Sequence, residues 1–132
     1  MKFRFLYISQ LLESIAFIAA TLLLVSGAHA QNLFVEDWGS GNIYIFTPDG
    51  AQGTFASGLS LPMGLAFNNS GDLFEADNGS GKIYRFTTNG PKSTFASGLS
   101  APHEIAFNAV DELFVADYGS GNIFKFTHCR PV

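Results

Sequence analysis

A 40-residue repeat constrains this chain more than any other feature of its sequence. Residues 33–72 and 73–112 are identical at 22 of 40 aligned positions, and residues 113–128 begin a third copy with 10 identities in 16 positions. A unit that returns at this spacing indicates a repeat architecture, in which each unit packs on its neighbours. The repeat therefore constrains the fold strongly and the activity weakly.

Each copy alternates short apolar runs with turn signals, which is the pattern of an all-β protein. We expect one complete blade of four strands, at residues 64–68, 72–76, 82–86 and 93–97, with counterparts elsewhere in the repeats at 33–36, 42–46, 53–57, 104–108, 112–116 and 122–126. Links such as Asn69-Ser70-Gly71 and the recurring Gly-Ser-Gly suit tight hairpins, because Gly adopts a positive φ at little cost. Four-stranded units of about 40 residues describe the blades of a β-propeller.

Aromatic residues recur with the same period. Phe34, Phe74 and Phe114 are 40 residues apart in sequence. In the strand at 42–46, alternation places two isoleucines on one face and Tyr44 with Phe46 on the other. A blade packs against a neighbour on both faces, so we expect these aromatics to form the core and not a ligand platform.

The first 30 residues are predicted to be a helical signal peptide. A positive start is followed by an apolar run of 11 residues at 15–25 and by Ala28-His29-Ala30, which predicts cleavage before Gln31. A membrane anchor is the alternative, but the uncharged run at 14–27 has 14 residues, fewer than the roughly 20 of a spanning helix. We therefore expect a secreted or periplasmic domain of residues 31–132, with no membrane contact after cleavage.

The expected mature chain is acidic, with ten acidic and five basic residues, hence a net charge of −5. Nucleic-acid binding needs a basic face, so this balance argues against a nucleic-acid partner. The single cysteine, Cys129, leaves no internal disulfide framework, and we interpret it as incidental.

The repeat resembles a known kind of blade. The residues that carry the resemblance are P-x-G-L-A-F-N at 62–68, G-D-L-F-x-A-D-x-G-S-G at 71–81 and I-x-x-F-T at 83–87. The pattern is similar to the NHL-type blade and to blades of the senescence-marker-protein/gluconolactonase superfamily of six-bladed propellers. Related seven-bladed streptogramin lyases have a similar blade. The resemblance covers residues 33–127 and implies a propeller, whereas such blades serve many functions.

The chain departs from a closed propeller in length. A six-bladed ring of this period needs about 240 residues, and the ten expected strands form two and a half blades, a partial β-propeller. The third copy reads His128-Cys129-Arg130 where the first reads Pro48-Asp49-Gly50, so we hypothesise a truncated or frame-shifted reading frame. An open stack exposes a sheet face at each end, which predicts pairing with other blades or chains of the same kind.

Three aspartates, Asp37, Asp77 and Asp117, begin the recurring D-x-G-S-G loop. They are candidates for a ring of carboxylates that holds a divalent cation such as Ca²⁺. We favour a structural role, in which each carboxylate accepts backbone N–H groups of its own turn, because the same residue occurs in every copy.

The residue after each of these aspartates differs between copies, as Trp38, Asn78 and Tyr118. Two aromatics on one face of a propeller are candidates for stacking on a sugar or an aromatic small molecule. The alternative is that they cap loops and pack on the next blade.

The sharpest deviation from the repeat is His103-Glu104, which replaces Met63-Gly64. This pair is a candidate general base or metal ligand. The resemblance to lactonases implies a metal-ligand role for Glu104, although the partner ligands would lie on blades outside this sequence; the alternative is drift in one copy. Two further acidic residues, Glu36 and Glu75, lie at non-equivalent positions, and we interpret them as scattered acidity.

We therefore expect a ligand- or protein-binding scaffold without independent catalysis. One alternative is a metal-dependent gluconolactonase-like hydrolase that needs further blades. Another alternative is a non-functional fragment.

Overall fold

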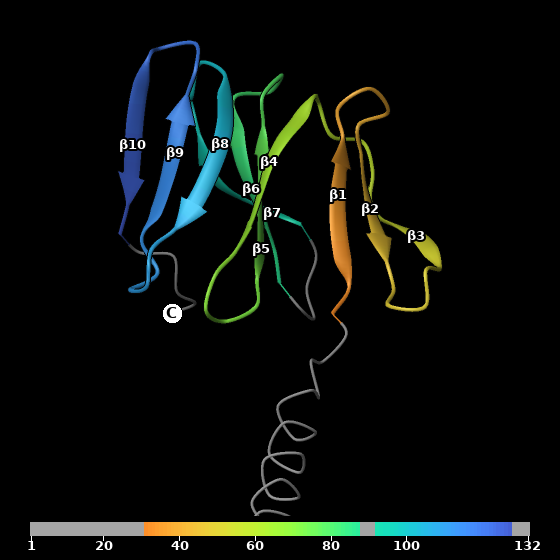
Figure 1. Cartoon of the computed structure of the whole chain (residues 1–132). Helices are drawn as coiled ribbons and strands as arrows, with labels where there is room; N and C mark the ends of the chain where they lie inside the picture. Colours follow the sequence, from red (N-terminus) through yellow and green to blue (C-terminus); the bar gives the residue numbers. More distant parts are fainter. Residues whose placement is uncertain (1–30, 88–91, 128–132) are drawn as a thin grey trace, which may run out of the picture. The chain divides into compact units, whose positions relative to one another are not determined.

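The structure is a computed structural model that describes residues 31–87 and 92–127. In these residues the chain forms three antiparallel sheets, which we name blades 1, 2 and 3 (Figure 1). Blade 1 contains β1 (Leu33–Asp37), β2 (Asn42–Phe46) and β3 (Gln52–Ala56). Blade 2 contains β4 (Pro62–Phe67), β5 (Leu73–Asp77), β6 (Lys82–Phe86) and β7 (Ser93–Ser97). Blade 3 contains β8 (Pro102–Phe107), β9 (Leu113–Asp117) and β10 (Asn122–Phe126). The all-β prediction is confirmed.

The described residues contain no helix that could cross a membrane. Two of the predictions concern residues that the structure does not describe. They are the signal peptide at 1–30 and the irregular third turn that contains Cys129.

The predicted strands match the observed ones within one residue except at the first strand of blade 2 and of blade 3. β4 and β8 begin at Pro62 and Pro102, two residues before the predicted starts. In both strands the register shifts directly after the proline, before Gly64 and Ile105 resume the ladder. Proline cannot donate to a ladder but is tolerated as the first residue of a strand or beside a bulge. The predicted starts were wrong because they excluded this irregular opening.

The two faces of each sheet pack against different neighbours. On blade 2, Leu73 and Glu75 face blade 1, whereas Phe74 and Ala76 face blade 3. We name the face that carries Leu73 the leading face of blade 2, and the face that carries Phe74 its trailing face. The same alternation places Leu33 and Val35 on the leading face of blade 1, and Phe114 and Ala116 on the trailing face of blade 3.

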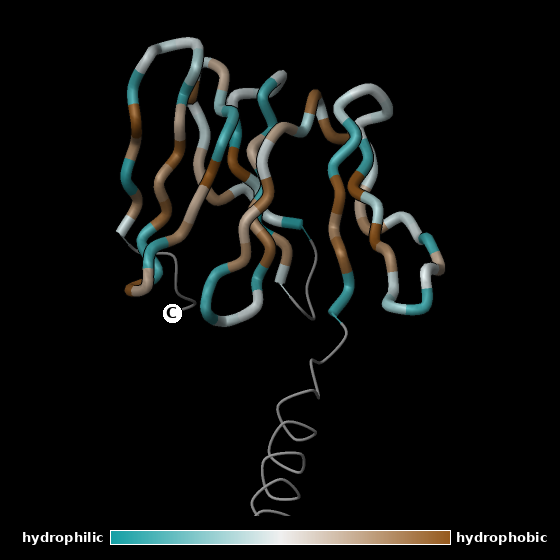
Figure 2. The backbone as a smooth tube through the Cα atoms, in the orientation of Figure 1, coloured by the Kyte–Doolittle hydropathy of each residue, from teal (hydrophilic) through white to brown (hydrophobic). Residues whose placement is uncertain are grey.

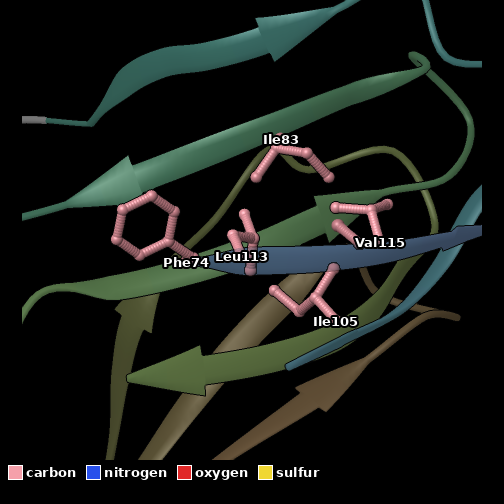
Figure 3. Packing of buried hydrophobic residues seen from close by; sticks show 6 residues of the cluster. Phe74, Ile83, Ile105, Leu113 and Val115 are labelled. Carbon is pink, nitrogen blue, oxygen red and sulfur yellow. The ribbon is translucent and has the colours of Figure 1, made fainter. Parts of the chain in front are cut away.

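The trailing face of blade 2 packs on the leading face of blade 3 and forms the larger core (Figure 3). Its side chains are at most 8% exposed: Phe74, Ala76, Ile83, Ile105, Leu113 and Val115. The Phe74 ring also meets the edge of Phe107, with 4.9 Å between centroids. Full burial of one such large side chain contributes about 1.5–3 kcal/mol.

A second core joins blades 1 and 2. Ile43 packs with Leu73 and Phe86, and the ring centroids of Phe34 and Phe67 lie 5.2 Å apart. Brown, hydrophobic stretches therefore follow the strands in all three blades (Figure 2). The prediction that the recurring aromatics form a core between blades holds for Phe34 and Phe74. Tyr44, Phe46 and Phe114 lie instead on faces that no described blade covers.

One residue breaks the apolar character of the second core. Glu75 lies on β5 opposite Tyr84, is 0% exposed, and neither of its carboxylate oxygens has a hydrogen-bond partner. Burial raises the pKa of Glu75 to about 8, with a smaller contribution from the negative charge of Asp77. The equivalent positions in blades 1 and 3 hold Val35 and Val115. The interpretation of Glu75 as scattered acidity missed this burial.

This buried carboxyl predicts a pH-dependent stability. The pKa of Glu75 is about 8 in the fold and 4.5 for the free side chain. Between these two pH values the carboxyl is therefore protonated in the folded chain and ionised in the unfolded chain. The free energy of unfolding should therefore fall as pH rises from about 4.5 to about 8, by on the order of 3–5 kcal/mol. Urea unfolding at a series of pH values measures this decline.

The matched variant is Glu75→Gln, which keeps the shape and removes the titration. Its unfolding free energy should vary much less with pH over the same interval than that of the unmodified chain. Parallel pH profiles for the two proteins would contradict the assignment.

Candidate functional site

A pocket of about 570 Å³ opens on blade 3. It is lined by His103 and Glu104 of β8, Asp117 and Tyr118 at the end of β9, and Asn122 and Ile123 of β10. Three of the residues that were singled out because they depart from the repeat, His103, Glu104 and Tyr118, therefore lie around one hollow. The sequence placed them on the same side of a propeller but did not predict that they share a pocket.

The backbone of blade 3 positions these side chains. The register of β8 on β9 shifts between Pro102 and Ile105, so His103 and Glu104 lie on the irregular part of the strand. Tyr118 follows β9 directly, and its backbone N–H donates to the carbonyl of Ala101 at 2.9 Å. An irregular strand opening and the adjacent turn therefore bring the three residues together.

The side chains around the pocket make close contacts but remain open to solvent. His103 Nδ1 lies 3.5 Å from Glu104 Oε1, and the ring centroids of His103 and Tyr118 are 6.4 Å apart. The Tyr118 residue is 81% exposed and the Glu104 side chain 74%. An imidazole beside a carboxylate can exchange a proton with a ligand, and an exposed phenol ring can stack on one.

Asn122 and Ile123 were missed by the sequence reasoning. In each copy the corresponding strand begins with a polar residue followed by Ile, as in Asn42-Ile43 and Lys82-Ile83. Ile43 and Ile83 are fully buried under the next blade, whereas Ile123 is 74% exposed. The repeat itself contains no signal that distinguishes a covered isoleucine from one that borders a pocket.

The three repeat aspartates accept hydrogen bonds within the fold. Asp37 accepts the N–H of Gly39 at 3.0 Å and the hydroxyl of Ser40 at 2.8 Å, and these contacts lower the pKa of its carboxyl. Asp77 accepts the N–H groups of Ser80 at 3.0 Å and of Ser60 at 2.8 Å. The predicted bonds from backbone N–H groups of the same turn are present at Asp37 and Asp77.

Asp117 extends this role between loops. Burial alone would raise the pKa of its carboxyl, but the N–H groups of Ala101 and Ser100 and the hydroxyl of Ser120 together hold that pKa below its ordinary value. Like Asp77, it therefore ties its own turn to the link that precedes the first strand of the same blade. The sequence reasoning predicted only the bonds within the turn.

The other two residues of the Trp38, Asn78 and Tyr118 set do not line the pocket. The Asn78 side-chain amide donates to the carbonyl of Pro102 at 3.2 Å, which ties blade 2 to blade 3. Trp38 is 66% exposed on blade 1. Of the three residues, Asn78 joins two blades, Trp38 is exposed on blade 1, and only Tyr118 lines the pocket.

A metal centre was considered at Asp37, Asp77, Asp117 and Glu104. Within residues 31–87 and 92–127, no group of three or more His, Cys, Asp or Glu side chains is arranged to hold a metal ion. A divalent cation at these residues stays a prediction.

The turn between β8 and β9 of blade 3 contains a further residue that the sequence did not indicate. Asp111 adopts a positive φ of 61°, and its carboxylate accepts the N–H of Asn69 at 2.8 Å. The Asn69 side chain donates in turn to the carbonyl of Ala109 at 3.3 Å. These bonds join the hairpin turns of blades 2 and 3 at the end of the sheets away from the pocket.

With this geometry in place, comparison with solved structures identifies the fold. Virginiamycin B lyase from Staphylococcus aureus superposes with a TM-score of 0.60 and 21% identity, over 76% of this chain and 39% of the lyase. A catalytically inactive variant of that lyase with quinupristin gives 0.61 and 18%, over 77% and 39%. A streptogramin B lyase structure gives 0.60 and 15%, over 75% and 38%.

The described sheets are blades of a β-propeller. The chain spans about two fifths of the length of these lyases. No protein-family model and no curated protein matches the sequence. Identities of 15–21% show a shared fold, so the narrower resemblance to NHL and gluconolactonase blades stays a prediction.

Substitution of Asp77, which joins two loops, should reduce stability more than substitution of Asp37, which bonds only within its own turn. Asp77→Ala removes a buried acceptor and leaves two backbone N–H groups of separate loops without a partner, which should cost about 2 kcal/mol of unfolding free energy. Asp37→Ala affects one more exposed turn and should cost less. Urea midpoints of the two variants provide the comparison, and an equal or larger loss at Asp37 would contradict it.

Proposed function

We propose that this chain is a propeller scaffold that binds a small molecule in the blade 3 pocket. The observation that carries the proposal is that the residues which depart from the repeat, His103, Glu104 and Tyr118, line one pocket. The turns that build the blades keep the repeat pattern, as the Asp, Gly, Ser and Gly of the three Asp-x-Gly-Ser-Gly turns do. Departures that converge in space favour a role in binding over random drift.

The chemistry of the pocket indicates the class of ligand. Tyr118 presents an exposed ring, which suits a sugar or aromatic group that can stack on it. His103 and Glu104 supply a donor or acceptor pair at the rim, 3.5 Å apart, which suits a ligand with hydroxyl or amine groups. The apolar edge formed by Ile123 adds surface that a small molecule can cover.

The test of this proposal uses quinupristin, the molecule named with one of the similar lyases, together with a panel of mono- and disaccharides. Calorimetric titration of the full chain should detect binding of at least one of these probes. Tyr118→Ala should weaken that binding about five-fold, the effect expected for the loss of about 1 kcal/mol of stacking.

Trp38→Ala is the matched control, because Trp38 occupies the same position in blade 1 and is also exposed but lies outside the pocket. It should leave binding unchanged. Equal losses in the two variants, or a loss only at Trp38, would contradict the assignment of the pocket.

A second candidate function is ring opening of a cyclic ester by the same pocket. The observation that favours it is the contact between the His103 imidazole and the Glu104 carboxylate, because a general base needs a second group that orients it. In this role His103 would accept a proton, and Glu104 would orient the ring or hold a divalent cation.

The catalytic candidate is tested by incubating the chain with glucono-lactone or quinupristin, with Ca²⁺ or with EDTA, and following product by mass spectrometry. Activity in the unmodified chain should fall about 100-fold in His103→Ala and in Glu104→Ala, the usual contribution of a general base. Turnover that survives both substitutions, or is absent throughout, would leave the binding scaffold as the better interpretation.

A further inference from the structure

Two sheet faces in the described part of the chain are not covered by another blade. On the leading face of blade 1, Leu33 is 62% and Val35 39% exposed. On the trailing face of blade 3, Ile123 is 74% exposed. The contacts inside the chain show what covers such faces, because the trailing face of each blade packs against the leading face of the next. The open trailing face of blade 3 and the open leading face of blade 1 are thus the two types of face that pack against each other inside the chain.

The packing of blade 3 on blade 2 requires a residue without a side chain at Gly64. A Cβ atom built there would overlap the carbonyl oxygen of His103 and lie 3.3 Å from both Glu104 Cα and the backbone nitrogen of Ile105. The inner strands β4 and β8 therefore approach each other with backbone against backbone. Any larger residue at this position would force the next inner strand away.

In blade 3 the corresponding position holds Glu104. Its side chain is 74% exposed and borders the pocket on the trailing face. A further blade that placed an inner strand as β8 is placed on β4 would therefore collide with Glu104. The trailing face of blade 3 can therefore pack against an apolar sheet. It excludes a sheet whose inner strand would lie against β8 as β8 lies against β4.

The sheet of blade 1 differs from that of blade 2 in its inner strand. Its sheet has the order β1-β2-β3, and these strands correspond to β5, β6 and β7 of blade 2. No strand of the described residues corresponds to β4 in this sheet. The leading face of blade 1 thus offers apolar surface from Leu33 and Val35, and the described residues of this sheet include no inner strand that would meet Glu104.

We propose that the trailing face of blade 3 docks on the leading face of blade 1 of a second copy of this chain, and that Glu104 selects this partner by excluding a blade that has an inner strand. Copies then join head to tail, in the manner of successive blades. The described residues of blade 1 place no strand against the pocket of His103, Glu104 and Tyr118, so the pocket stays open at the junction. This inference does not depend on the identity of the pocket's ligand.

Light scattering coupled to size exclusion tests the assembly on protein expressed from the full coding sequence. The mass should be twice that of the chain or a larger whole multiple, and it should fall on dilution. Val35→Lys on the leading face and Ile123→Lys on the trailing face should each give monomers. Val110→Lys is the control, because Val110 is 64% exposed but lies in the turn between β8 and β9.

The decisive step is to mix the two monomeric variants. Ile123→Lys keeps a functional leading face and Val35→Lys keeps a functional trailing face, so a head-to-tail contact predicts one 1:1 dimer that goes no further. A contact between like faces predicts no such mixed dimer and would overturn the proposal, as would a monomer of the unmodified chain at all concentrations. If either variant unfolds early, Leu33→Lys and Ala116→Lys test the same two faces.

The selective role of Glu104 has its own test. Residues 62–72 contain β4 and the turn that leads into β5. A copy of these residues inserted before Leu33 supplies blade 1 with an inner strand that is joined to β1 as β4 is joined to β5. The insertion should abolish assembly while Glu104 is present, and Glu104→Gly in the same protein should restore it. Assembly of the inserted form with Glu104 in place would overturn the selection, and this result is distinguishable from a failure of the pocket to bind a ligand.

Discussion

The packing of each sheet on the next is the contact on which the rest of this structure depends. No blade contains enough apolar surface within itself, because a sheet one layer thick has two faces and no interior. Phe74, for example, is fully buried in a core that it shares with Leu113 and Val115 of the following blade. The turns, links and inner strands serve to hold successive sheets at the distance at which these side chains touch.

Polar groups at the ends of the sheets hold that distance. Asp77 and Asp117 each join two loops of one blade, while Asn78 and Asp111 connect blade 2 with blade 3. Because these bonds lie at the rims, they leave the faces free for apolar contact. The same aspartates that suggested a ring of metal ligands are thus already engaged as acceptors of backbone N–H groups.

Two glutamates show how a single departure from the repeat changes a blade. Glu75 replaces a valine in the covered interface between blades 1 and 2, where its carboxyl is buried without a partner and its pKa is raised to about 8. Glu104 replaces a glycine on the uncovered face of blade 3, where the side chain extends into a pocket. The first replacement links stability to pH, and the second changes which surface can dock on the blade.

The sequence by itself determined the blades of this protein, since the 40-residue period, the alternation of apolar residues and the glycine turns are local signals that each strand carries. It also identified His103, Glu104 and Tyr118 as departures from the repeat. Only the tertiary structure decided that these three residues share a pocket, that Glu75 is fully buried, and that Ile123 is exposed while Ile43 and Ile83 are covered. The reason is physical: exposure depends on whether another sheet lies against a face, and identical residues in a repeat acquire different surroundings from their neighbours in space.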